Sequence, residues 1–210
     1  MELIVSAKYV GLAVFAYLLG SIPWGLILTR QFADVDVRQT GSKNIGATNV
    51  LRSAGLGLGI LTLIGDLSKG ALPVWIAAEM TAQPESPNTI YVSAVALCAF
   101  AGHLYPAFLK FKTGGKGVAT AAGCFLIISP AATGIALIIF ILFAGIANRV
   151  SAGSLAAVTA LAPAVWWLTN TGPFTACAVV MAVFVYARHR ENIRRLISGT
   201  EPAIRGGKNK

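Results

Sequence analysis

Long apolar runs separated by short polar segments dominate this chain. The runs cover roughly residues 5–28, 55–80, 90–109, 117–147, 152–168 and 174–187. A helix needs about 20 apolar residues to cross the hydrocarbon core of a bilayer. The pattern therefore predicts an all-α membrane protein with several transmembrane helices.

The run 117–147 is too long for one simple span. At ~1.5 Å per residue, a straight helix of this length would extend about 46 Å, whereas the bilayer core is ~30 Å thick. Pro130 lies near the middle, and a proline disfavours helical backbone at the residue before it. The run is either one long tilted span or two short helices, about 117–129 and 131–147.

Basic residues decide between these alternatives. Fifteen of the 17 Lys and Arg lie in segments 29–52, 110–116 and 148–150 and in the tail from residue 188. Segments 169–173 and 81–89 hold none, and the latter contains Glu85. Basic segments stay in the cytoplasm, so an even number of crossings must separate 110–116 from Arg149, which requires two helices.

We therefore expect one domain over 1–210 with seven transmembrane helices. The N-terminus should lie outside and the C-terminus in the cytoplasm, and the protein should reside in the inner membrane with its basic face toward the cytoplasm.

Composition supports the membrane class and excludes others. The chain is 56% hydrophobic and only 12% charged, against about 25% charged in soluble domains. Its net charge of +9 gathers between the apolar runs rather than on a soluble face, which argues against nucleic-acid binding. The three cysteines lie in apolar runs without a CxxC pair, so we expect no disulfide framework and no metal site.

A polar cluster over residues 41–52 is the first candidate binding segment. Ser42, Gly46 and Asn49 follow helical spacing and would share one helix face, and Ser42 or Asn44 would cap such a helix. The guanidinium of Arg52 matches phosphate oxygens well. The segment predicts an anion pocket, with an ordinary capped interfacial helix as the alternative.

A glycine-rich stretch forms the second cluster, with His103 upstream and Gly114, Gly115, Lys116 and Gly117 in sequence. Glycine-rich backbone before a helix directs N–H groups and a positive dipole at phosphate. A Walker motif would need Ser or Thr after the lysine. Phosphate recognition is therefore predicted, against the alternative of a flexible turn with basic anchors.

Three smaller groups complete the candidate chemistry. Ser151 and Ser154 follow Arg149 at the start of a span, as pocket hydroxyls or as an ordinary helix cap. The tail segment 188–196 would continue the helix of the last span, with His189 and Asn192 at i and i+3. It is either functional or a solvated amphipathic helix. Asp66 and Lys69 lie within a span, where ionisable groups are functional or neutralise each other. Together the clusters indicate one phosphate-rich site.

The motifs in combination are similar to those of the bacterial acyl-phosphate-dependent glycerol-3-phosphate acyltransferase family. They are Ser42-x-Asn44-x-Gly46-x-x-Asn49-x-x-Arg52, Gly65-Asp66-x-x-Lys69-Gly70, Gly-Gly-Lys-Gly-Val-Ala-Thr at 114–120, and His-Arg-Glu-Asn-Ile at 189–193. The resemblance covers essentially the whole chain. It implies transfer of a fatty acyl group from acyl phosphate to glycerol-3-phosphate, giving lysophosphatidic acid and phosphate, by a monomer without cofactor or metal.

The resemblance also implies roles for individual residues. Arg52, Lys116 and Asn192 would contact substrate phosphates, and Ser151 or Ser154 would supply a catalytic hydroxyl. The predicted substrate-binding residues are Ser42, Asn44, Gly46, Asn49, His103, Gly114, Gly115, Gly117, His189 and Glu191. Thr113 separates Lys112 from Gly114, which departs from the family pattern, so Lys110 and Lys112 receive no role.

The mechanism we expect is direct attack on an activated carbonyl. His103 and His189 lack the His-x4-Asp pair of soluble glycerolipid acyltransferases, since Phe108 and Arg194 stand at those positions. Positioning and electrostatic stabilisation would then supply the catalysis. The alternatives are an anion or phosphate-ester transporter, which would also use broken helices, and a structural membrane scaffold.

Overall fold

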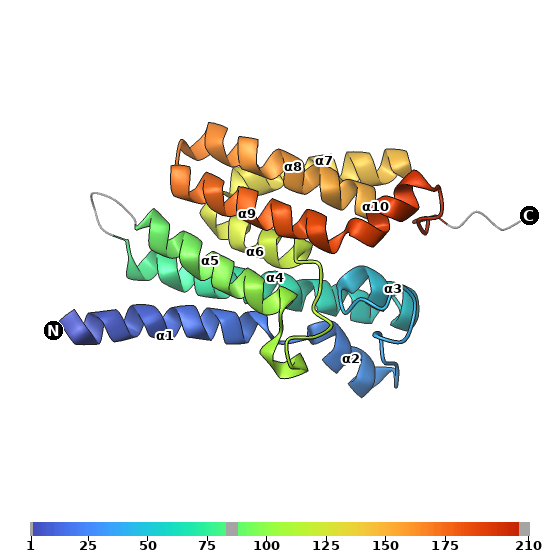
Figure 1. Cartoon of the computed structure of the whole chain (residues 1–210), viewed down its shortest axis with the longest axis horizontal. Helices are drawn as coiled ribbons and strands as arrows, with labels where there is room; N and C mark the ends of the chain where they lie inside the picture. Colours follow the sequence, from blue (N-terminus) through green and yellow to red (C-terminus); the bar gives the residue numbers. More distant parts are fainter. Residues whose placement is uncertain (1, 83–87, 206–210) are drawn as a thin grey trace, which may run out of the picture. The chain divides into compact units, whose positions relative to one another are not determined.

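The computed structural model describes residues 2–82 and 88–205, and it contains helices and no strand within those ranges. The elements along the chain are shown in Figure 1: α1 (Glu2–Gly20), α2 (Trp24–Phe32), α3 (Ala47–Ala54), α4 (Leu56–Met80), α5 (Thr89–Leu104), the 3₁₀ turn η1 (Ala107–Leu109), α6 (Val118–Ile128), α7 (Pro130–Ala147), α8 (Val150–Thr169), α9 (Gly172–Arg188) and α10 (Arg190–Ile197). Glu85, in the predicted outer segment, and the tail residues Lys208 and Lys210 lie outside the described ranges.

The all-helical membrane architecture agrees with the sequence. Four stretches of the described chain are long and apolar enough to cross a membrane: α4, α5 with its extension to Leu109, α7 and α8. The number rises to six if the bent pairs α1–α2 and α9–α10 each form one span. Helix α6 is apolar but has only 11 residues.

The break at Pro130 is confirmed. Helix α6 ends at Ile128, and α7 begins at Pro130 with Ser129 as its N-cap, whose Oγ accepts a hydrogen bond from the N–H of Ala132 at 3.4 Å. The prediction of two short helices holds only for α6, because α7 has 18 residues and is long enough to cross by itself.

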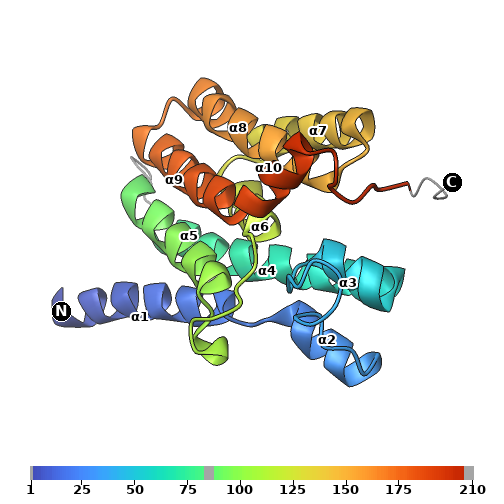
Figure 2. The ribbon, with the colours of Figure 1, turned by 45° about the vertical axis from the view of Figure 1, so that its right-hand side comes forward.

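Two bends interrupt segments that were expected to be continuous helices, and Figure 2 shows both. The run 5–28, read as one span, bends by 43° between α1 and α2. Pro23 stands at this bend, where its missing N–H and its ring disfavour a continuous helix. The tail helix, read as continuing from the last span, turns by 61° between Arg188 and Arg190. His189 makes this turn with φ −99° and ψ 6°.

The chain divides into two compact units, Met1–Ile128 and Ser129–Lys210, while the expectation of one domain over 1–210 stays a prediction. In the first unit α1 packs along α5 and α4 packs along α6 (Figure 1). A Cβ on Gly70 would lie 2.3 Å from the carbonyl oxygen of Thr120, and one on Gly123 would lie 2.0 Å from that of Leu67. The α4 and α6 backbones therefore meet through glycines, as membrane helices commonly do.

The second unit packs α8 against both α7 and α9. Helix α7 keeps many large apolar side chains exposed, including Leu137, Ile138, Ile141, Phe143 and Ile146. In water such a band would be an aggregation-prone patch, whereas lipid tails accommodate it without cost. The exposed faces thus support the membrane assignment independently of helix length.

Candidate functional site

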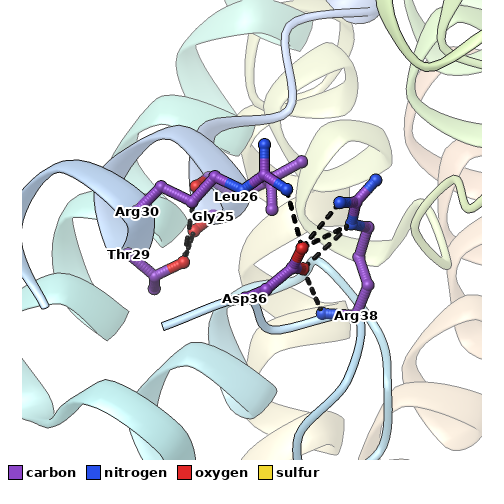
Figure 3. Close-up of polar contacts among 6 residues, drawn as sticks. All are labelled: Gly25, Leu26, Thr29, Arg30, Asp36 and Arg38. Carbon is purple, nitrogen blue, oxygen red and sulfur yellow. Dashed lines mark hydrogen bonds and ion pairs between the residues drawn. The ribbon is translucent and has the colours of Figure 1, made fainter. Parts of the chain in front are cut away.

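Asp36 organises the polar loop between α2 and α3. Its carboxylate accepts hydrogen bonds from Arg30 Nη2 at 2.7 Å and from Arg38 Nη2 at 2.6 Å and Nε at 2.9 Å (Figure 3). The Arg38 hydrogen bond, aided by Arg30, outweighs the opposing effect of desolvation and holds the pKa of Asp36 far below its usual range. Asp36 therefore pairs with Arg30 at the end of α2 and with Arg38 in the loop.

An apolar cluster packs against the same loop and fixes it. Its buried members are Leu26, Val37, Ile45 and Val50, and Leu109 of η1 packs against them. The cluster ties α2, the loop, α3 and the η1 turn into one body, so the polar loop and the turn before the glycine-rich stretch hold a common position.

Asn49 completes this framework. Its side chain is 2% exposed. Its Oδ1 accepts a hydrogen bond from the N–H of Ser42 at 2.8 Å, and its Nδ2 donates to the carbonyls of Asn44 at 2.8 Å and Val37 at 2.9 Å. The Asn49 amide therefore bonds to the loop backbone through both its oxygen and its nitrogen.

The predicted helix face of Ser42, Gly46 and Asn49 does not form. Helix α3 begins only at Ala47, and Gly46 is its N-cap without a side-chain capping bond. Asn44 Oδ1 instead accepts from the N–H of Gly46 at 2.9 Å. Such local side-chain bonds favour turns over helix, so Ser42 and Asn44 stand in the loop. Ser42 and Arg52 are both exposed on this segment.

The glycine-rich stretch lies over the last turns of α5 and leads into α6. The N–H of Gly115 donates to the carbonyl of His103 at 3.1 Å. A Cβ on Gly115 would lie 1.9 Å from His103 Nε2, and one on Gly117 would lie 2.3 Å from a ring carbon of Phe100. Gly117 also has φ +86°, which favours glycine. Lys116, half-buried, thus stands between two close contacts, two residues before Val118, the first residue of α6.

A buried polar group lies next to this stretch. Lys69 Nζ is 2.8 Å from Asp66 Oδ1 and donates to the carbonyl of Ile22 at 2.9 Å. The same Asp66 oxygen is 3.6 Å from His103 Nδ1. The ion pair matches one of the two alternatives drawn from sequence, while the addition of His103 was not foreseen.

The second unit holds a polar cluster around Glu201. Oε1 accepts from Ser151 Oγ at 2.7 Å and from Asn192 Nδ2 at 2.6 Å, and Oε2 accepts from Arg195 Nε at 2.7 Å. Burial alone would raise the pKa of Glu201, but these hydrogen bonds outweigh it and bring the pKa below its ordinary value. Glu201 therefore aligns Ser151 and Asn192 on one oxygen.

Sequence reasoning did not assign a role to Glu201. A signal was available, because it is the only acidic residue after Glu191 in a strongly basic tail. Its partners lie 50 and 9 residues away, and no local spacing connects them.

The remaining predicted residues of this unit separate from the cluster. Ser154 Oγ donates within its own helix to the carbonyl of Val150 at 3.0 Å, so Ser151 is the serine that joins Asn192. His189 is buried, with Nδ1 2.8 Å from the carbonyl of Val185. Glu191 is exposed and lies 3.6 Å from Arg194, on the solvent side of α10. Within residues 2–82 and 88–205, no three metal-ligating side chains gather in one place.

Comparison with known proteins identifies relatives over almost the whole chain. The family model described as "Glycerol-3-phosphate acyltransferase" matches residues 10–199. The glycerol-3-phosphate acyltransferase of Syntrophotalea carbinolica is 47% identical over 186 residues, covering 89% of this chain and 92% of that protein. The enzyme of Geotalea daltonii is 50% identical over 190 residues, covering 90% and 94%.

Solved structures agree with these relatives. The crystal structure of PlsY, an integral membrane glycerol 3-phosphate acyltransferase, in its glycerol 3-phosphate form matches with a TM-score of 0.87 and 34% identity, covering 93% of this chain and 95% of that one. The lysophosphatidic acid form matches with a TM-score of 0.85. The multi-span helical architecture, the glycine-rich stretch and these matches together show that this chain belongs to the glycerol-3-phosphate acyltransferase family of integral membrane proteins.

Proposed function

We propose that this protein transfers a fatty acyl group from acyl phosphate to glycerol-3-phosphate, giving lysophosphatidic acid and inorganic phosphate. The observation that carries the proposal is the stretch Gly115-Lys116-Gly117 at the start of α6. The first turn of a helix has N–H groups without intrahelical acceptors, and such a terminus binds phosphate readily. Both substrates carry phosphate, and the relatives named above include structures with glycerol 3-phosphate and lysophosphatidic acid.

The chemistry needs no covalent intermediate. Acyl phosphate is a mixed anhydride, so its carbonyl carbon is already electrophilic. The substrate hydroxyl attacks that carbon, the C–O bond to phosphate breaks, and a phosphate oxygen takes the hydroxyl proton. Lys116 and the neighbouring backbone N–H groups stabilise the negative charge that develops. Trapping of an acyl group on a serine or cysteine of the enzyme would contradict this mechanism.

In the first unit, Lys116 and Arg52 are proposed to bind substrate phosphate, with Ser42 as a hydroxyl donor. The proposed acyl-phosphate loop is Gly114, Gly115 and Gly117. Asn49 and Asn44 hold the neighbouring loop through the hydrogen bonds described above.

In the second unit, Ser151 and Asn192 are the proposed hydroxyl and amide donors. Glu201 already gathers both groups on one oxygen, which supports a shared task. Ser154, bonded within α8, is the weaker candidate.

The decisive experiment measures phosphate release from palmitoyl phosphate by the purified protein in lipid mesophase or mild detergent. Release should depend on glycerol-3-phosphate, lysophosphatidic acid should form in equal amount, and Lys116→Ala should abolish both. Lys112→Ala is the matched control, because it removes an exposed lysine from the same segment.

Absence of acceptor-dependent release from folded protein, with palmitoyl-CoA also inactive, would refute the proposal. Uptake of phosphate into liposomes would then favour the transporter alternative.

We also propose seven crossings, with the N-terminus outside and the basic segments and active site facing the cytoplasm of the inner membrane. The number depends on α6, whose 11 residues extend only about 17 Å against a core of ~30 Å. The basic segments on either side of α6–α7 support two crossings there. Single cysteines at Ser42 and Thr171, in a background without native cysteines, should react with impermeant reagents from opposite sides.

A further inference from the structure

The buried polar group of Asp66, Lys69 and His103 joins three separate segments of the first unit. Asp66 and Lys69 come from α4 and His103 from the end of α5, while the carbonyl of Ile22 belongs to the α1–α2 bend. The three side chains are at most 4% exposed. A buried ion pair is costly and contributes little net stability, and ionisable residues within membrane spans usually serve function.

His103 connects this group to the glycine-rich stretch. Its Nδ1 faces Asp66 at 3.6 Å. Its opposite ring nitrogen, Nε2, faces Gly115 so closely that no Cβ could fit between them. The His103 carbonyl also accepts the Gly115 N–H. The imidazole therefore fills the space between the Asp66 carboxylate and the Gly115 backbone.

Phe100, one turn earlier on the same helix, makes a second contact with the glycine-rich stretch. Its ring lies against Gly117, where a Cβ would also overlap. Phe100 and His103 are both buried, so Gly115 and Gly117 rest on adjacent turns of α5. Lys116 lies between Gly115 and Gly117, so a shift of either His103 or Phe100 moves the Lys116 backbone.

We propose that Asp66, Lys69 and His103 form a buried support that positions the Gly114–Gly117 loop for phosphate binding, with His103 as a positioning residue rather than a substrate contact. The proposal rests on the function proposed above for this loop. Asp66 and Lys69 hold the imidazole in place. The imidazole edge fixes the position of the Gly115 backbone and therefore that of Lys116. Misplacement of a binding group by about 1 Å can cost 100-fold in rate.

Two replacements of His103 separate its two ring atoms. In His103→Asn the side-chain nitrogen takes the place of Nδ1, toward Asp66, and no side-chain atom takes the place of Nε2 next to Gly115. In His103→Gln the longer amide takes the place of Nε2, beneath Gly115. Ser93→Ala is the control, because it alters a buried polar residue on the same helix ten positions away, about 15 Å.

The first readout is hydrogen exchange of the amides of residues 114–119 in lipid nanodiscs without substrate. We expect roughly tenfold faster exchange in His103→Asn, and near wild-type exchange in His103→Gln and Ser93→Ala. The second readout is kcat/KM for palmitoyl phosphate, which should fall roughly tenfold or more in His103→Asn. In His103→Gln the logarithm of kcat/KM should fall by less than half as much.

Equal loop exchange in the Asn and Gln variants would overturn the proposal, whether both resemble wild type or both are loosened. If His103→Asn does not fold, the double variant Asp66→Asn/Lys69→Gln removes the ion pair together, and unchanged loop exchange there would overturn it as well. Exchange is measured without turnover. A wild-type protein lacking acceptor-dependent activity would therefore refute the proposed function. The difference in loop exchange between His103→Asn and His103→Gln would still test whether His103 positions the loop.

Discussion

Replacing Gly115 by alanine tests how tightly the phosphate loop is seated. The added Cβ would lie 1.9 Å from Nε2 and 2.5 Å from Cε1 of His103, whereas ordinary van der Waals contact begins at 3.4 Å. The gap must therefore widen by about 1.5 Å, the difference between 1.9 and 3.4 Å. The imidazole has little room to retreat because Asp66 stands behind it, paired with Lys69. The loop, with Lys116, is the part that must move.

The size of the effect follows from that displacement. A misplacement of about 1 Å can cost 100-fold in rate, so Gly115→Ala should lower kcat/KM by about 100-fold, equivalent to about 2.7 kcal/mol of transition-state stabilisation. The loss should appear with both substrates, because a displaced Lys116 weakens stabilisation of the leaving phosphate rather than one binding site alone.

The assay is acceptor-dependent phosphate release from palmitoyl phosphate over a range of both substrate concentrations. The matched control is Gly134→Ala in α7, where no atom lies within 4 Å of the added Cβ; its activity should stay within threefold of wild type. A folded Gly115→Ala protein with activity within threefold of wild type would refute the geometric argument.

Three further predictions concern Glu201 and Asp36, two carboxylates outside the spans. Glu201→Ala should lower the free energy of unfolding by about 2–4 kcal/mol, because the buried Ser151 and Asn192 and the partly exposed Arg195 lose their acceptor. Glu201→Gln should lose less, and thermal unfolding in detergent measures both. Because the Glu201 pKa is below its ordinary value, its stabilisation is complete above about pH 4.3 and disappears as the pH falls through the folded-state pKa. The melting temperatures of wild type and Glu201→Gln should therefore converge in acid, and a constant difference would contradict the linkage. Asp36→Asn should cost only about 0.5–1 kcal/mol, since its Arg30 partner is 56% exposed and solvent screens the pair; a loss above about 3 kcal/mol in the same unfolding assay would show that this estimate is wrong.

Local sequence features predicted the elements that depend on local physics. Apolar length predicted the spans, because each helix must match a hydrocarbon layer of fixed thickness. Pro130 predicted the α6–α7 break, because its effect on Ser129 is exerted through neighbouring backbone atoms. The glycine-rich stretch was likewise predicted to precede a helix, and α6 begins at Val118.

Local patterns failed where a side chain could bond either on its own helix face or to another segment of the chain. Helical spacing aligned Ser42 with Asn49, but the Asn49 amide bonds to the backbone of the preceding loop and keeps Ser42 outside α3. The spacing of His189 and Asn192 suited a helix continuing from α9, yet the chain turns at His189, and Asn192 then reaches Glu201.

The sequence by itself thus determined the membrane class, the main helix break and the residue types able to bind phosphate. Only the tertiary structure decided which of those residues act together. Ser151 meets Asn192 through Glu201, 50 residues from the serine, and Gly115 rests on His103, whose ring is backed by Asp66 of another helix. Such contacts depend on how helices pack, and packing is set by the shapes of surfaces that are far apart in the chain, so no spacing along the sequence encodes them.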